Sequence, residues 1–131
     1  MRRTTFLLVL IAAFLSTVFV QTAQAQGLGN YVETYTARLS ARDHYNSNGV
    51  RLRSAAAIIR QDRANYYVYG LRDSEDEPDP YFSSKSNRAR LEEMLENGQT
   101  TPDAIDRIVN GTPLIRVDIY ATGISVTILS D

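Results

Sequence analysis

The chain has 131 residues, with 14 Lys and Arg against 15 Asp and Glu, one His, and neither Cys nor Trp. This length leaves room for one domain, and a hydrophobic fraction of 44% is typical of a globular protein. The near-zero net charge argues against a dedicated nucleic-acid binder, and the lack of Cys excludes disulfide scaffolds, thiolate zinc sites and cysteine nucleophiles.

Residues 1–25 have the three parts of a secretory signal peptide. Two arginines follow the first Met, residues 6–20 form an apolar run of 15, and Ala23-Gln24-Ala25 is a small-x-small cleavage site. The apolar run is shorter than the roughly 18–20 residues of a membrane span. The sequence therefore predicts cleavage between Ala25 and Gln26, a periplasmic or secreted location, and no membrane attachment of the mature chain.

Three elements are predicted in the first half of the mature chain. Residues 31–40 alternate between apolar and polar side chains, which is typical of a half-buried strand. Residues 43–49 are rich in Asn and Gly and predict a turn. Ser54 is an expected helix N-cap, and the pattern that follows predicts a helix over 55–69 that ends at Gly70.

The second half is predicted to hold two helices and a β-hairpin. An acidic loop over 72–80 contains two prolines and separates these elements from the first helix. Apolar spacing predicts helices over 87–97 and 102–110. Alternation over 113–121 and 123–129 predicts two strands joined by a short turn.

Together these elements predict a single α+β domain over residues 26–131. A two-stranded hairpin is marginal on its own, so strand 31–40 is expected to join it in a three-stranded, mainly antiparallel sheet. About three helices would then pack on one face of that sheet.

Four stretches of the mature chain carry a resemblance to a known group of proteins. They are LSARDHYNSNG (39–49), AAAIIRQDRANYY (55–67), EDEPDPYF (75–82) and GTPLIRV (111–117). With these stretches the chain resembles small exported proteobacterial proteins that have no assigned activity. The resemblance implies an exported location and carries no mechanism.

Two segments carry oxygen ligands of the kind that Ca²⁺ prefers. The segment around His44, Asn46, Asn48 and Gly49 lacks the first Asp and the twelfth-position Glu of an EF-hand, so an Asn-Gly turn is the better interpretation. The other segment is an acidic run, and such runs are more often solvated loops than metal sites. Its candidate metal ligands are Asp73, Glu75, Asp76, Glu77 and Asp79.

His44 is the one imidazole of the chain and the basis of a catalytic alternative. With Asp43 or Asp62 it would form an acid–base pair, as in a small periplasmic hydrolase or lyase. A serine nucleophile is not indicated, because the sequence has no G-x-S-x-G motif.

Asp62 is the residue whose position fits its chemistry least. On the predicted first helix it falls in the middle of the apolar face that includes Ile58 and Ile59. A carboxylate there must be paired or hydrogen-bonded. Donors on the 43–49 loop are the expected partners, so that Asp62 would hold this loop to the helix, whereas Arg63 is placed toward a flank of the helix.

The favoured function is an exported, non-catalytic binding or interaction module of the bacterial cell envelope. Its partner would be an unidentified envelope protein or small ligand, with no cofactor and no nucleic acid. Aromatic side chains suit such docking. The periplasmic hydrolase or lyase and a Ca²⁺-stabilised envelope domain are the alternatives. The candidate binding residues are Asp43, His44, Asn46, Asn48, Asp62, Arg63, Tyr66, Tyr81 and Phe82.

The signal-peptide interpretation predicts that the exported protein begins at Gln26, because the Ala-x-Ala site follows an apolar run of suitable length. Intact mass spectrometry of the exported protein should give the mass of residues 26–131. A species that keeps residues 1–25 in the inner membrane would show that the segment is an anchor instead.

Overall fold

The fold is built on one three-stranded antiparallel sheet. A computed structural model describes residues 27–131, so the expected signal peptide lies outside the described residues. The strands are β1 (Tyr31–Arg38), β2 (Leu114–Tyr120) and β3 (Ile124–Ser130), in the spatial order β1-β2-β3. The predicted α+β class and the joining of the first strand to the C-terminal hairpin are thereby confirmed.

Alternating side chains give this sheet one apolar face. Tyr35 on β1 is opposite Val117 on β2, which is opposite Val126 on β3, and all three side chains are buried. A bulge between Tyr31 and Glu33 shifts the register at the start of β1. Because side chains of a strand alternate between faces, this shift turns Tyr31 outward, where it is 57% exposed.

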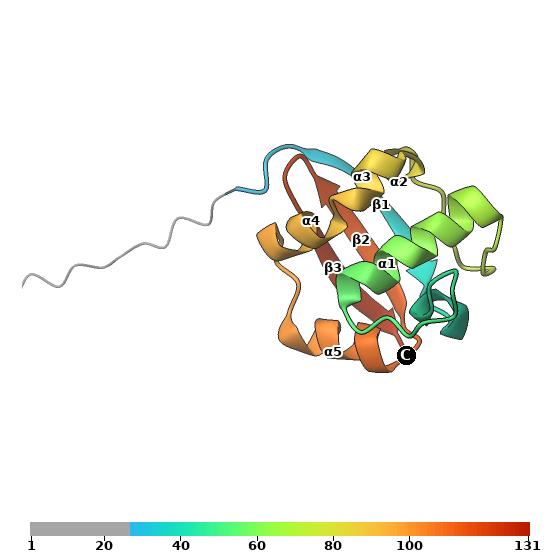
Figure 1. Cartoon of the computed structure of the whole chain (residues 1–131). Helices are drawn as coiled ribbons and strands as arrows, with labels where there is room; N and C mark the ends of the chain where they lie inside the picture. The colour runs from blue at the N-terminus through green and yellow to red at the C-terminus, as the bar shows by residue number, and fades with distance from the viewer. Residues whose placement is uncertain (1–26) are drawn as a thin grey trace, which may run out of the picture.

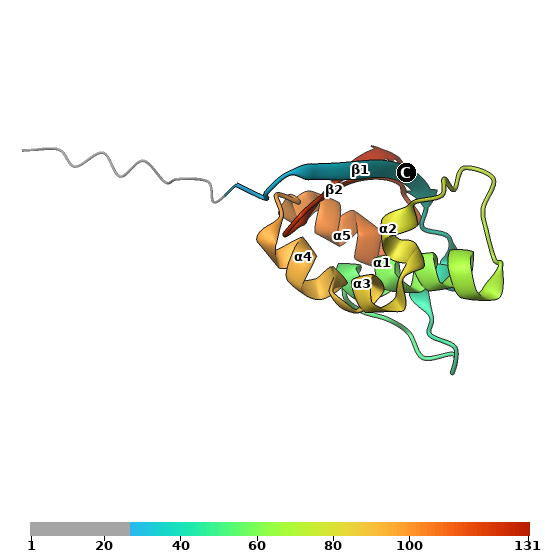
Figure 2. The same ribbon diagram turned by 90° about the horizontal axis from the view of Figure 1, so that it is seen from above.

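The helices all pack on the apolar face. Figure 1 shows α1 crossing in front of the sheet, and Figure 2 shows every labelled helix on the same side of it. None of the helices within residues 27–131 has the length and the apolar composition that crossing a membrane requires. The helices are the 3₁₀-helix η1 (Ala41–His44), α1 (Ala55–Ala64), the π-helix η2 (Asn65–Tyr69), α2 (Pro80–Ser83), α3 (Lys85–Ala89), α4 (Leu91–Asn97) and α5 (Pro102–Asn110).

The helix predicted over 55–69 is present as α1 followed directly by η2. The Ser54 side chain accepts a hydrogen bond from the Ala57 N–H at 3.2 Å, as an N-cap does. Gly70 ends the helix with φ of +67°, a left-handed conformation that glycine adopts without steric cost.

The helix predicted over 87–97 is instead two short helices, and a further one precedes it. Ser84, not a later serine, is the N-cap of α3, and Arg90 separates α3 from α4. The short α2 was not predicted, because its signal is only the Asp79 N-cap followed by a proline at the first helical position. The described chain therefore has five α-helices where about three were expected.

The core lies between the sheet and α1. Ile58 and Ile59 of α1 are fully buried, as are Phe82 of α2, Met94 of α4 and Ile108 of α5. Burying one such side chain contributes about 1.5–3 kcal/mol. Each of these short helices is thus anchored in a single shared core.

The acidic segment, residues 73–79, runs along the outer edge of β1. The Glu77 N–H donates to the Thr36 carbonyl at 2.8 Å, and the Thr36 N–H donates to the Glu77 carboxylate at 2.8 Å. The Arg38 N–H donates to the Asp76 carboxylate at 2.9 Å. A covered edge is protected from pairing with other chains. The segment is mostly exposed, as expected, and it also covers the edge of β1, which was not expected.

The end of α4 meets β3 with very little free space. A Cβ added at Gly98 would lie 1.6 Å from the carbonyl oxygen of Ile124. We expect Gly98→Ala to lower the free energy of unfolding by about 3 kcal/mol, because the backbone must move to accommodate the methyl group. Urea denaturation measures the change. Gly27→Ala is the control, since nothing lies within 4 Å of a Cβ there, and equal unfolding midpoints for the two variants would contradict this packing.

Candidate functional site

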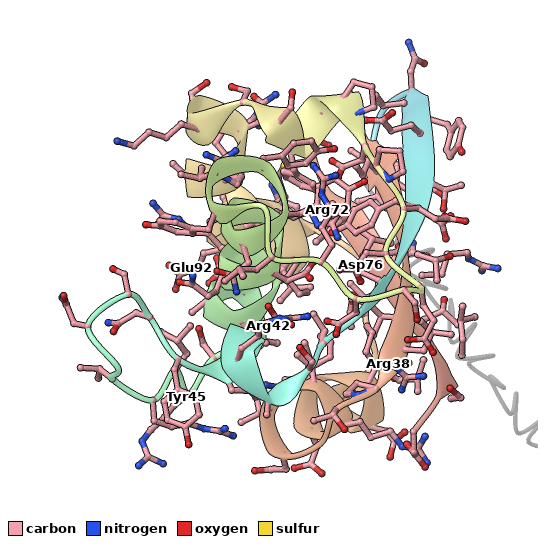
Figure 3. The ribbon with its side chains drawn as sticks, turned by 90° about the vertical axis from the view of Figure 1, so that its right-hand side faces the viewer. Arg38, Arg42, Tyr45, Arg72, Asp76 and Glu92 are labelled. Atoms are coloured by element: carbon pink, nitrogen blue, oxygen red, sulfur yellow. The ribbon has the colours of Figure 1, made fainter. Side chains whose placement is uncertain are left out.

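A pocket opens between the α1–η2 helix and the loop that follows η1. Its volume is about 350 Å³ and its walls are mostly apolar. Figure 3 looks at this side of the molecule, with Tyr45 on the projecting loop and Arg42 between it and Arg72. We call it the Tyr45–Tyr69 pocket. It is lined by Arg42, Tyr45, Asn46, Ser47, Gln61, Asn65, Tyr69 and Leu71.

One wall of the pocket is a row of side chains on α1 and η2. Gln61, Asn65 and Tyr69 are spaced four apart and therefore lie along one side of the helix. The Gln61 Nε2 group donates to Asn65 Oδ1 at 2.9 Å, which orients both amides. The second part of this row lies on the π-helical turn, a feature that is frequent at functional sites.

The other wall is the projecting loop. The Asn46 side chain accepts hydrogen bonds from the Asn48 and Val50 N–H groups at 3.0 and 2.9 Å. Gly49 has φ of +73°, which closes the turn predicted for this part of the chain. Asn46 thus both lines the pocket and shapes its wall, whereas Asn48 is exposed at the turn. The loop presents the Tyr45 ring, which is 45% exposed.

Asp43 joins the loop to the helix beneath the pocket. Its carboxylate accepts from Asn65 Nδ2 at 2.8 Å and from the Ser40 N–H at 2.8 Å. Burial raises the pKa of the Asp43 carboxyl, although these hydrogen bonds favour its ionised form. The expectation that Asp62 holds this loop to the helix is wrong, because Asp43 and Asn65 make that connection.

His44 is buried outside the pocket. Its Nδ1 lies 3.0 Å from the Ser40 carbonyl oxygen, its Nε2 lies 2.9 Å from the Ile108 carbonyl oxygen, and the residue is 1% exposed. The ring therefore lies between the backbone carbonyls of the η1 N-cap and of α5, and its N–H donates to a carbonyl. A general acid–base His must reach its substrate, so this placement disfavours the hydrolase or lyase alternative.

Arg63 is the centre of a buried ion cluster formed with Asp62 and Asp79. Its Nε donates to the Asp62 carboxylate at 2.8 Å, and its Nη1 donates to the Asp79 carboxylate at 2.8 Å and to the Glu77 carbonyl at 2.9 Å. Arg63 and Asp79 are fully buried and Asp62 is 2% exposed. The burial expected for Asp62 is confirmed. The flanking position expected for Arg63 is wrong, because its charge is paired inside the protein.

Aromatic rings enclose the Arg63 guanidinium. Its Cζ lies 4.2 Å from the ring centroid of Tyr35 and 4.8 Å from that of Tyr66, within the range of cation–π attraction. The Arg63 Nη2 group and the Tyr35 hydroxyl find no hydrogen-bond partner among residues 27–131. Tyr66, a candidate ligand-binding residue, is therefore part of the interior packing around the ion cluster.

The ion cluster has one guanidinium for two carboxylates. Asp79 accepts hydrogen bonds from Arg63, from the Phe82 N–H at 2.7 Å and from the Tyr67 hydroxyl at 3.2 Å. Asp62 accepts from Arg63 alone among the described residues. Burial raises the pKa of Asp62 to about 8, and burial also raises the pKa of Asp79, whose ionised form is favoured by more hydrogen-bond donors.

The carboxylates of the acidic segment all bind groups of this chain. Asp73 pairs with Arg42 at 2.6 Å, and Glu75 pairs with Arg38 at 2.8 Å. The Arg38 guanidinium holds the pKa of Glu75 below its usual value. The other three carboxylates bind the β1 backbone or Arg63. The described part of the chain contains no group of three or more His, Asp or Glu that could hold a metal ion.

Tyr81 and Phe82 do not form an exposed docking patch. Phe82 is fully buried and its ring packs edge-on against Tyr35, with the centroids 6.2 Å apart. Tyr81 is half-buried, and its hydroxyl accepts a hydrogen bond from Arg90 at 3.2 Å. Both side chains therefore hold α2 to the body of the domain.

Sequence reasoning missed most of the pocket. Of its lining residues only Asn46 was a candidate, whereas Tyr45, Gln61 and Tyr69 were not. Gln61 lies on the side of the helix away from its apolar face, but at about 100° per residue Tyr69 falls on the apolar face, so the helical pattern alone would not have found this wall.

No family model, curated protein or solved structure matches this chain. The resemblance to small exported proteobacterial proteins therefore stays a prediction.

The raised pKa of Asp62 predicts that stability falls as the pH rises. The pKa of Asp62 is about 8 in the folded state against an ordinary value of 3.8, so the folded protein holds a proton that the unfolded chain releases. The stability from this group is fully present below about pH 4 and is lost as the pH rises to about 8, by up to about 1.4 kcal/mol per pH unit. Urea denaturation across this range measures the slope.

Asp62→Asn is the informative variant for this slope. It keeps an oxygen that accepts from Arg63 Nε and removes the titrating proton, so its pH profile should be flatter than that of the parent. Burial also raises the pKa values of Asp43 and Asp79, but both residues are present in both proteins. Parallel profiles for parent and variant would show that Asp62 is not the group that titrates.

Proposed function

We propose that this protein is an exported, non-catalytic binding module of the bacterial cell envelope and that the Tyr45–Tyr69 pocket is its ligand site. The observation that carries the proposal is a group of exposed apolar side chains around a hollow. Tyr45, Tyr69 and Leu71 are 45%, 56% and 47% exposed and all line the pocket. Such concave apolar surfaces with a few polar groups are typical of ligand sites.

The buried position of the reactive groups supports binding over catalysis. His44, Asp43 and Asp62 are the residues on which an acid–base mechanism would depend, and each is at most 2% exposed. Each also binds a group of this chain through its side chain. A substrate in the pocket would therefore meet aromatic rings and amides, which bind and orient a ligand but are poor proton-transfer groups at neutral pH.

The location in the cell envelope is supported by the sequence of residues 1–25. A basic start, an apolar run and an Ala-x-Ala site are the features that direct a chain to export. The mature domain would then meet its ligand outside the inner membrane.

The pocket can be tested with N-phenyl-1-naphthylamine, an uncharged aromatic probe that fluoresces in apolar sites. We expect saturable fluorescence with the mature protein. Tyr45→Ala and Tyr69→Ala should each weaken probe binding by about fivefold, because each removes an aromatic contact worth about 1 kcal/mol. A fluorescence titration measures the dissociation constants, and circular dichroism verifies that the variants stay folded.

Tyr31→Ala is the matched control for these variants. Tyr31 is 57% exposed, which equals the exposure of Tyr69 within one per cent, but it lies on β1 against Tyr120 and does not line the pocket. The probe should bind this variant as it binds the parent. If all three variants bind the probe equally well, the pocket is not the binding site and the proposed function fails.

A further inference from the structure

Two guanidinium groups without a carboxylate partner flank the Tyr45–Tyr69 pocket. The Arg51 Cζ lies 5.6 Å from the ring centroid of Tyr45, and Arg72 directly follows Leu71 with its Cζ 4.1 Å from the ring centroid of Tyr66. Neither arginine forms a salt bridge within residues 27–131. Neither side chain lines the pocket itself, and each donates one hydrogen bond to a backbone carbonyl, Arg51 to Val109 at 2.7 Å and Arg72 to Tyr66 at 3.3 Å. The remaining N–H groups of each guanidinium are available to an anionic group of a ligand.

The lining itself also favours a ligand with carboxylates. It contains one basic residue, Arg42, and no acidic residue. Arg42 is already paired with Asp73 at 2.6 Å, so the carboxylates of a ligand would have to pair with the other arginines near the pocket. Acidic residues outnumber basic ones over residues 27–131, which gives this part of the chain a negative net charge. The two arginines near the pocket that have no carboxylate partner therefore carry the charge opposite to this net charge.

The size and polarity of the pocket favour one side chain of a polypeptide. A volume of about 350 Å³ accommodates a single large apolar or aromatic side chain between the rings of Tyr45 and Tyr69. The amide of Gln61 donates through its Nε2 to Asn65. Its Oε1 atom accepts no hydrogen bond from residues 27–131. This oxygen is placed to accept a backbone N–H of an extended segment.

We infer that the pocket binds an acidic polypeptide segment that inserts one large apolar side chain between Tyr45 and Tyr69 and places flanking carboxylates at Arg51 and Arg72. This inference rests on the proposed binding function and adds the chemical class of the partner. The apolar side chain would supply affinity, and the charges would supply selectivity and steering.

The test uses fluorescein-labelled heptapeptides in anisotropy titrations with the mature protein. Three peptides have a central tryptophan flanked by acidic, neutral or basic residues, and a fourth is the acidic peptide with alanine in place of tryptophan. We expect the acidic tryptophan peptide to bind about tenfold more tightly than the neutral one, with loss of this advantage at high salt. The basic peptide and the alanine peptide should bind more weakly than either.

Single substitutions test which arginines bind the carboxylates of the acidic peptide. Arg51→Gln and Arg72→Gln should each weaken binding of the acidic peptide by about threefold, and Arg72→Lys should retain most of the affinity, since exposed ion pairs are individually weak. Arg60→Gln is the matched control, because Arg60 is exposed, has no salt bridge within the described residues and lines a different hollow against α3 and α4. N-phenyl-1-naphthylamine should bind all four variants as it binds the parent.

The outcomes separate this inference from the proposed function. If the neutral or basic peptide binds as tightly as the acidic one, or if the Arg51 and Arg72 variants behave like Arg60→Gln, the inference is overturned while the pocket still binds the uncharged probe. Tighter binding of a labelled oligothymidylate than of the acidic peptide would overturn it in favour of nucleic acid. Failure of the uncharged probe to bind would overturn the proposed function itself.

Discussion

The buried guanidinium of Arg63 is the group on which the rest of the structure depends. A charge removed from water is tolerated only when opposite charges and hydrogen bonds surround it. Asp62 comes from the same helix as Arg63, whereas Asp79 lies 16 residues after Arg63. Because both carboxylates pair with Arg63, the acidic segment is held across the end of the helix. That position brings the segment to the outer edge of β1 and sets where α2 begins, because Asp79 is also the N-cap of α2.

The ion cluster also fixes how the helix is rotated, and the rotation determines the pocket. Asp62 and Arg63 are placed inward, and the π-helical turn η2, in which each residue turns the helix by less than in an α-helix, brings Tyr69 to the pocket with Gln61 and Asn65. A rotation by one residue would expose a charged member of the cluster and bury an amide without its partner. Buried ion pairs often add little net stability, and their best-attested use is to select one arrangement over others. The pocket wall is a consequence of that selection.

The sequence predicted those features of this fold that depend on local pattern. Period-two alternation marks the strands, and Ser54 and Gly70 mark the ends of the first long helix, because these signals lie within a few residues of the structure they specify. The interior placement of Arg63 could not be predicted in this way, since an arginine is assigned to the surface until the distant carboxylate that pairs with it is known. The edge cover made by the acidic segment was missed for the same reason, as were the pocket residues contributed by two separate parts of the chain.

The proposed function follows from which polar groups are bound inside the protein and which groups are exposed at the pocket. The groups with acid–base chemistry, His44 and the carboxylates beside it, are oriented by backbone and side-chain partners inside the protein, where they stabilise the arrangement of η1, α1 and α5. Aromatic rings are exposed on the pocket side, and nearby the guanidiniums of Arg51 and Arg72 bind backbone carbonyls but have no carboxylate partner among residues 27–131. Rings and guanidiniums hold a ligand through contact area and charge, and their affinity does not require a change of protonation near neutral pH. The burial of His44, Asp43 and Asp62 beside an exposed aromatic pocket therefore supports the proposed binding function over the catalytic alternative.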